Sequence, residues 1–186
     1  MFIAIPQSFK SVTTNIWPNH WRIQAITIKL NSTNLLLINS YFPNDPRTLN
    51  FDDSSLNEVF EEVKAIIAGH AFDHVILLGD INTDFLRRSG HVHAVADFLE
   101  NLNLVRSWEK FDADFSHVNE ANGISYTSLI DHFFWNTTIN DKISECGVLH
   151  LVDNLSDHNP IYCKLEVNTV PEISSKEAPL PIPRPN

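Results

Sequence analysis

Basic residues are scarce in this sequence. Its 186 residues include 13 lysines and arginines against 23 aspartates and glutamates, which gives a formal net charge of −10. Proteins that coat nucleic acid without sequence preference neutralise phosphates with lysine and arginine, so this balance argues against that class. The balance does not exclude a phosphodiesterase, because a divalent cation held by carboxylates can create a phosphate-binding surface.

Cysteines and long apolar runs are also few. The two cysteines, Cys146 and Cys163, form neither a short metal-binding spacing nor a disulfide framework. No segment approaches the roughly 18 apolar residues that a membrane-spanning helix requires. The N-terminal MFIAIPQSFK lacks the charged start and long apolar centre of a signal peptide. We therefore expect an intracellular protein, nuclear or cytoplasmic, that is neither secreted nor bound to a membrane.

The order of apolar and polar residues predicts alternating strands and helices. Apolar positions three and four residues apart predict helices over 55–69 and 91–102. Apolar runs predict strands over 21–30, 34–42, 74–80, 123–135 and 159–167, the first two as a hairpin. Because several connections are short, we expect a layered α/β sandwich with a mixed sheet, formed by residues 1–168. Residues 169–186 are rich in proline and predict a linker or disordered tail.

Four clusters of polar residues follow or begin the predicted strands. They are Asn39 and Tyr41 in INSYFPN, Asp80 and Asn82 in GDIN, Asp131 in SLIDHFF, and Asp157 with His158 in LSDHNPI. Each cluster taken alone is also explained by structure, as a turn, a backbone hydrogen bond or a buried paired acid. Strand ends in an α/β scaffold converge, however, and the core beneath holds polar groups there rigidly. We therefore expect the four clusters to share one site.

The residue types in these clusters match the needs of phosphodiester hydrolysis. A divalent metal requires oxygen ligands and neutralises charge that develops on the phosphate. A carboxylate must orient and deprotonate the attacking water. A histidine held by an aspartate stabilises the transition-state charge. Asp131 and His158 can form that aspartate–histidine pair, which leaves Asp157 for the metal and Asp80 for the base or the metal.

The ordered set N-x-Y-x-P, G-D-(apolar)-N, S-x-I-D and S-D-H resembles the motifs of the endonuclease/exonuclease/phosphatase superfamily. It is most similar to the abasic-site-type endonuclease domains of non-LTR retrotransposons, over about residues 1–167. The resemblance implies a two-layer mixed β-sandwich flanked by helices, and a Mg²⁺- or Mn²⁺-dependent endonuclease that nicks DNA. It also implies a reverse transcriptase domain that follows in a longer parent protein.

The resemblance also implies a role for each motif residue. Tyr41 would contact a substrate phosphate, with Asn39 beside it. Asp80 would activate the attacking water, and Asn82 would support it at the scissile phosphate. Asp131 would orient His158, and His158 would contact that phosphate. Asp157 would bind the metal together with Asp80.

One part of the family pattern is absent. Family members carry an Asn and then a metal-binding Glu, each at the end of a strand, with a helix between them. No residue here matches, because the first glutamate is Glu58, on the predicted helix. The segment FIAIP at 2–6 resembles the strand that follows that Glu, so we expect a domain without its first strands and helix. Asp157 and Asp80 alone would bind Mg²⁺ weakly, and we expect low or no nuclease activity.

Two other functions stay open at this point. The first is a superfamily phosphatase or phospholipase, although TSLIDHFFW lacks the Trp and Arg arrangement usual around the third motif of inositol-phosphate phosphatases. The second is an inactive remnant that serves as a nucleic-acid-binding or protein-binding module. The missing glutamate and the negative net charge favour this second alternative over the first.

Overall fold

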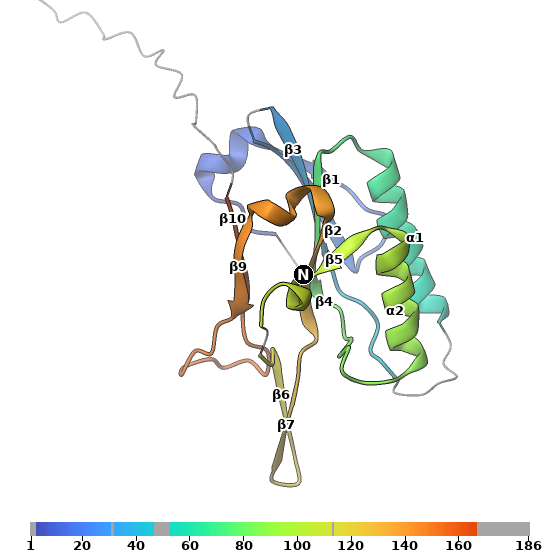
Figure 1. Cartoon of the computed structure of the whole chain (residues 1–186), viewed down its shortest axis with the longest axis vertical. Helices are drawn as coiled ribbons and strands as arrows, with labels where there is room; N and C mark the ends of the chain where they lie inside the picture. Colours follow the sequence, from blue (N-terminus) through green and yellow to red (C-terminus); the bar gives the residue numbers. More distant parts are fainter. Residues whose placement is uncertain (1–2, 31, 47–52, 113, 167–186) are drawn as a thin grey trace, which may run out of the picture.

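A mixed six-stranded sheet forms the centre of the fold. The computed structural model describes residues 3–30, 32–46, 53–112 and 114–166 (Figure 1). The strand order is β1-β2-β3-β4-β8-β5, in which β3 and β4 are parallel and all other neighbours are antiparallel. The strands are β1 (Thr13–Ile16), β2 (Ile23–Leu30), β3 (Thr33–Ser40), β4 (His74–Asp80), β5 (Leu104–Arg106) and β8 (Asp131–Asn136).

Two α-helices cover one face of this sheet, α1 (Ser54–Gly69) and α2 (Gly90–Asn101) (Figure 1). Each buries one stripe of apolar side chains, which is the reason the three-and-four spacing predicted both helices. The rings of Phe60 in α1 and Phe98 in α2 stack with centroids 3.9 Å apart, inside the larger apolar core. Within the described residues, no helix is long and apolar enough to cross a membrane.

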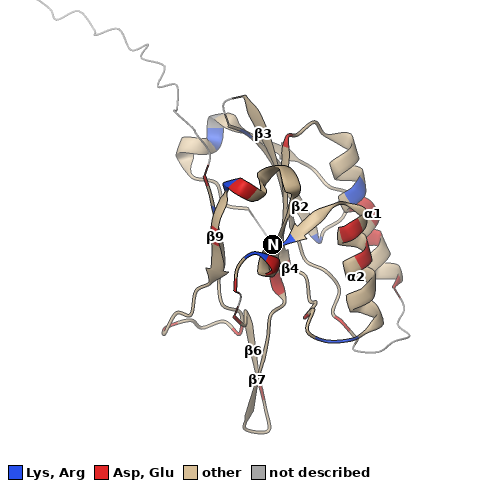
Figure 2. Ribbon diagram, viewed as in Figure 1, with Lys and Arg blue, Asp and Glu red and all other residues tan. Residues whose placement is uncertain are grey.

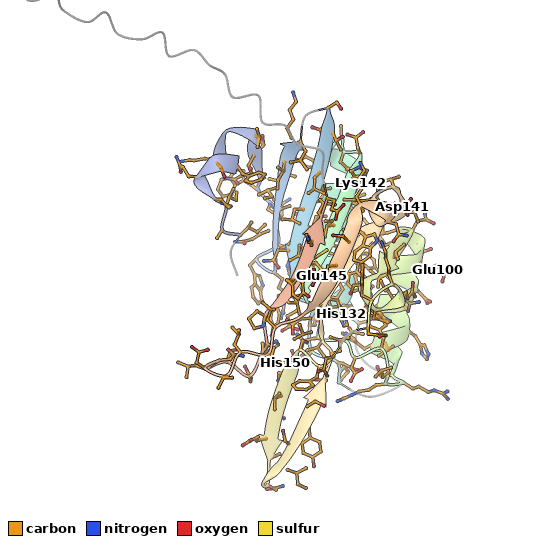
Figure 3. The ribbon with its side chains drawn as sticks, turned by 60° about the vertical axis from the view of Figure 1, so that its left-hand side comes forward. Glu100, His132, Asp141, Lys142, Glu145 and His150 are labelled. Carbon is orange, nitrogen blue, oxygen red and sulfur yellow. The ribbon has the colours of Figure 1, made fainter. Side chains whose placement is uncertain are left out.

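A small antiparallel sheet of β9 (Ile143–Val148) and β10 (Ile161–Leu165) covers the opposite face. A second apolar core lies between the two sheets and is centred on Trp135, Ile139 and Ile143. The remaining elements are the 3₁₀ helices η1 (Gln7–Val12), η2 (Ser107–Glu109) and η3 (Thr137–Lys142), and the strands β6 (His117–Ala121) and β7 (Ile124–Ser128). The hairpin formed by β6 and β7 projects from one end of the molecule (Figures 1 and 3).

The predicted layered α/β fold with a mixed sheet is confirmed, including the hairpin of β2 and β3. The strand expected over residues 2–6 is wrong, because residues 3–6 have no regular structure and lead into η1. Pro6 lies directly before η1 with φ −56°, and a proline there lacks the N–H that a strand ladder needs. The predicted tail at 169–186 lies outside the described residues, and the expected loss of the first strands and helix stays a prediction.

Candidate active site

The four polar clusters meet at one edge of the large sheet. Because β3 and β4 are parallel, their carboxyl ends lie side by side, and the antiparallel β8 begins at the same edge. Asp80 at the end of β4 therefore faces Asp131 at the start of β8 as its register partner. A cleft of about 520 Å³ opens here, and it is lined by Trp21, Arg22, Asn39, Tyr41, Gly79, Asp80 and Asp131.

Gly79 allows the close approach of two strands beneath the cleft. Its φ of +130° is a conformation that side chains with a Cβ rarely adopt. A Cβ at this position would lie 2.1 Å from the Ser40 carbonyl oxygen and 2.9 Å from Oδ1 of Asn39. The glycine of the G-D-I-N motif therefore leaves space for the Asn39 side chain and positions Asp80 next to it.

Asp131 and His158 form a hydrogen-bonded pair. Nδ1 of His158 lies 2.9 Å from Oδ2 of Asp131. This hydrogen bond is the main reason that the pKa of His158 is raised, although burial acts in the opposite direction. The buried Ser116 hydroxyl accepts the backbone N–H groups of Ile130 and Asp131, each at 3.0 Å, and so holds the start of β8 in place. A carboxylate that holds an imidazole ring in one orientation is the arrangement that a histidine needs to act as a general acid or to bind a phosphate.

The environment of Asp80 shifts the pKa of its carboxyl group. Burial, and then the negative charge of Asp131, raise its pKa from 3.8 to about 6. One of its oxygens, Oδ1, accepts the backbone N–H of Asn82 at 3.0 Å. A carboxyl group with a pKa near 6 takes up and releases protons close to neutral pH, as a general base must.

Asn82 serves the backbone around the site. Its φ is +51°, and its side-chain amide donates a hydrogen bond to the carbonyl oxygen of Phe42 at 2.9 Å. The amide nitrogen therefore joins the loop after β4 to the loop after β3. The backbone N–H of Asn82 therefore binds Asp80, while its side-chain N–H binds the Phe42 carbonyl oxygen.

His132 fixes the strand that carries Asp131. It lies on β8, is labelled in Figure 3, and has only 2% of its surface exposed. Burial lowers its pKa to about 4, so the neutral ring donates from Nε2 to the Thr83 carbonyl oxygen at 2.8 Å. This contact ties β8 to the loop that follows β4.

Asp157 lies at the rim of the site with a neighbour that the sequence patterns do not reveal. Its side chain is exposed, and Oδ2 lies 3.8 Å from Nε2 of His117 at the start of β6. His117 also forms an isolated β-bridge with His158, and the Val118 N–H donates to the Asp157 carbonyl oxygen at 2.9 Å. No spacing in the sequence links position 117 to positions 157 and 158, so only the folded chain shows this contact.

Trp21 and Arg22 are further cleft residues absent from the sequence-based assignment. They directly precede β2, whose pairing with β3 aligns Ile23 with Ser40. The predicted hairpin therefore contained a signal for them, because its register places the residues before β2 opposite Tyr41. The cleft lining includes both residues.

Two adjoining groups of side chains can offer atoms to a metal ion. Asp80, Asp131 and His158 form one, and His117, Asp157 and His158 form the other, each with its ligand atoms within 4.8 Å of one another. Carboxylate oxygens of this kind suit Mg²⁺ or Mn²⁺. The two carboxylates predicted to share the metal therefore lie in different groups, joined by His158. Neither group found among the described residues contains a glutamate.

Known structures share this fold. The chain is similar to the endonuclease domain of TRAS1, a telomere-specific non-LTR retrotransposon, with a TM-score of 0.66, 18% identity and coverage of 80% of this chain and 65% of that one. It is also similar to an endonuclease/exonuclease/phosphatase family protein from Leptotrichia buccalis C-1013-b, with a TM-score of 0.55, 23% identity and coverage of 78% of this chain and 54% of that one. The third structure is the 3'-5' exonuclease NExo from Neisseria meningitidis, with a TM-score of 0.61, 17% identity and coverage of 78% of this chain and 65% of that one.

The chain therefore has the fold of the endonuclease/exonuclease/phosphatase proteins, and the predicted resemblance is confirmed for the fold. It spans between 54% and 65% of the length of these three structures, which is less than two thirds. No protein-family model and no curated protein sequence matches the chain.

Proposed function

We propose that this chain hydrolyses phosphodiester bonds in DNA with the help of a divalent cation, as an endonuclease that nicks one strand. The observation that carries the proposal is the Asp131–His158 hydrogen bond of 2.9 Å beside Asp80, at the edge of an open cleft. DNA is the proposed substrate because the structures with this fold include a retrotransposon endonuclease domain and an exonuclease.

The geometry supports different roles for the Asp131–His158 pair and for Asp80. His158, with its raised pKa, donates a hydrogen bond or a proton to a phosphate oxygen, while Asp131 fixes the orientation of the ring. Asp80, with a pKa of about 6, accepts the proton of the attacking water. Tyr41 and Asn39 line the cleft next to Asp80, where they contact phosphate oxygens of the bound strand.

Mg²⁺ or Mn²⁺, when bound, supplies positive charge that stabilises the phosphate in the transition state. Asp157 and Asp80 are the residues proposed to hold it, although each belongs to a different one of the two groups that share His158. Because two separated carboxylates bind Mg²⁺ weakly without substrate phosphates, we propose that turnover is slow. The net charge of −10 weakens DNA binding further.

Nicking of supercoiled plasmid tests the proposal. The assay compares the parent chain with Asp80→Asn and His158→Ala, in Mg²⁺ and in Mn²⁺. A matched control is Asp153→Asn, which removes the charge of an exposed aspartate outside both metal-binding groups. We expect slow nicking that both site variants abolish and the control retains. Nicking that persists in both site variants contradicts the hydrolytic function. The absence of nicking at every concentration of either metal contradicts it as well. Both outcomes favour the binding-module alternative.

A further inference from the structure

An aromatic and cationic stack forms one wall of the cleft. The Cζ atom of Arg22 lies 4.4 Å from the ring centroid of Trp21 and 4.7 Å from that of Tyr41. The Trp21 and Tyr41 rings are 6.5 Å apart and tilted by 56°, and His20 lies nearly parallel to Trp21 with centroids 6.2 Å apart. Trp21, Arg22 and Tyr41 all line the cleft that contains Asp80.

The backbone holds this stack in position. The Tyr41 N–H donates to the Arg22 carbonyl oxygen at 2.9 Å, and the Arg22 guanidinium donates to the Tyr41 carbonyl oxygen at 3.5 Å. The Arg22 N–H donates to Nδ1 of His20 at 3.2 Å. Two hydrogen bonds therefore join Arg22 to Tyr41, the residue after β3, and a third joins Arg22 to His20, so hydrogen bonds hold both ends of the aromatic wall in position.

Trp21 remains open to solvent in spite of this order. Its exposed fraction is 74%, although an indole is among the side chains that gain most from burial. An exposed aromatic ring beside a guanidinium is an arrangement on which nucleobases stack in proteins that bind single strands. Stacking of this kind is available only to a base whose face is not already covered by its neighbours in a duplex.

The charges around the cleft also favour a single strand with unpaired bases over a duplex. Among the described residues that line it, Arg22 is the one lysine or arginine, beside two aspartates. Figure 2 shows the Lys and Arg positions as short, separate segments spread over the ribbon. A surface of this kind has little capacity to track the two phosphate backbones of a duplex. Stacking on an aromatic ring provides affinity that does not depend on positive charge.

We infer that Trp21, with Arg22 and Tyr41, binds an unpaired nucleotide of a DNA strand, with the base on the indole and a neighbouring phosphate at the guanidinium. The inference rests on the proposed function for the choice of DNA as ligand. It goes further by naming the substrate class, which is single-stranded DNA or DNA with unpaired bases next to the cleaved bond. Fully paired duplex is the poorer ligand.

Fluorescence anisotropy in EDTA tests the inference without cleavage. The probes are a fluorescein-labelled oligothymidine of about 12 nucleotides and the same strand in a blunt duplex. We expect tighter binding of the single strand, and a loss of about 5- to 150-fold in Trp21→Ala, the range that corresponds to removal of one stacked base. Trp21→Phe keeps an aromatic face and retains most of the affinity.

Trp17→Ala is the matched control. Trp17 is 85% exposed and is not among the residues that line the cleft, so its removal leaves the affinity unchanged. Equal or tighter binding of the blunt duplex overturns the inference. So does an equal effect of Trp21→Ala and Trp17→Ala, with folding of both variants verified by circular dichroism.

Plasmid nicking separates this inference from the proposed function. Nicking that requires His158 but is unchanged in Trp21→Ala, together with single-strand affinity that is also unchanged, supports the function and overturns the inference. Single-strand binding that requires Trp21 in a chain without any nicking supports the inference and overturns the function. Loss of single-strand affinity in Trp21→Ala, with nicking present and dependent on His158, supports both.

Discussion

Replacement of Asp80 by asparagine is expected to stabilise the folded chain while it removes hydrolysis. The substitution keeps the size of the side chain and the oxygen that accepts the Asn82 N–H at 3.0 Å. It removes a negative charge that burial and the neighbouring Asp131 both disfavour. A functional carboxylate held in an unfavourable environment reduces stability, and its neutral replacement restores it.

The magnitude follows from the pKa. In the folded chain the pKa of Asp80 is raised from 3.8 to about 6. Each pH unit of difference between the folded and unfolded states corresponds to about 1.4 kcal/mol, so the ionised carboxylate opposes folding by at most about 3 kcal/mol. Because the cleft is open to water, solvent screening reduces the value to about 1–2 kcal/mol.

The sign of the pH dependence is specific. An acid whose pKa is raised by folding destabilises the folded state above that pKa, here above about pH 6. The destabilisation shrinks as the pH falls, and it disappears below the pKa of the unfolded state, where the carboxyl is neutral in both states. Asp80→Asn is therefore expected to raise the free energy of unfolding at about pH 8 and to change it little at about pH 4 or below.

Urea unfolding in EDTA, followed by circular dichroism, measures this difference. The control Asp153→Asn changes an exposed aspartate, and we expect its effect to stay within about 0.5 kcal/mol at both pH values. An Asp80→Asn chain that is less stable than the parent at about pH 8 refutes the reasoning. A gain of the same size at both pH values refutes it as well, because the gain would then not arise from the charge.

Three further predictions concern the residues around Asp80. Gly79→Ala is expected to lower the free energy of unfolding by about 2–4 kcal/mol, because its Cβ would meet the Ser40 carbonyl oxygen; unchanged urea unfolding contradicts this. Ser116→Ala is expected to cost about 2–3 kcal/mol in the same assay, since two backbone N–H groups lose their acceptor; a smaller change than at an exposed serine contradicts it. Asp131→Asn is expected to lower the pKa of the His158 ring, measured by NMR titration of its protons, and an unchanged titration shows that the hydrogen bond does not raise it.

The sequence by itself determined both α-helices, the strands β2, β3, β4 and β8, and the chemical types at the ends of these strands. The apolar spacing of α1 and α2 and the apolar run of β4 are local patterns, and hydrophobic burial makes such patterns reliable. The polar residues of the four motifs, among them Asp80, Asp131 and His158, stand where these patterns stop. That position was sufficient to predict a shared site, because strand ends are the places where a sheet leaves side chains free.

Only the tertiary structure decided which of these residues touch. The parallel pairing of β3 with β4 and the antiparallel pairing of β4 with β8 set the Asp80–Asp131 register. Burial at this edge of the sheet, and then the charge of Asp131, raise the pKa of Asp80 to about 6. The contact of His117 with Asp157 depends on segments that are distant in the chain. Distances between such segments, and the burial that changes the charge of a carboxyl group, are properties of the packed sheet and have no counterpart in a local sequence pattern.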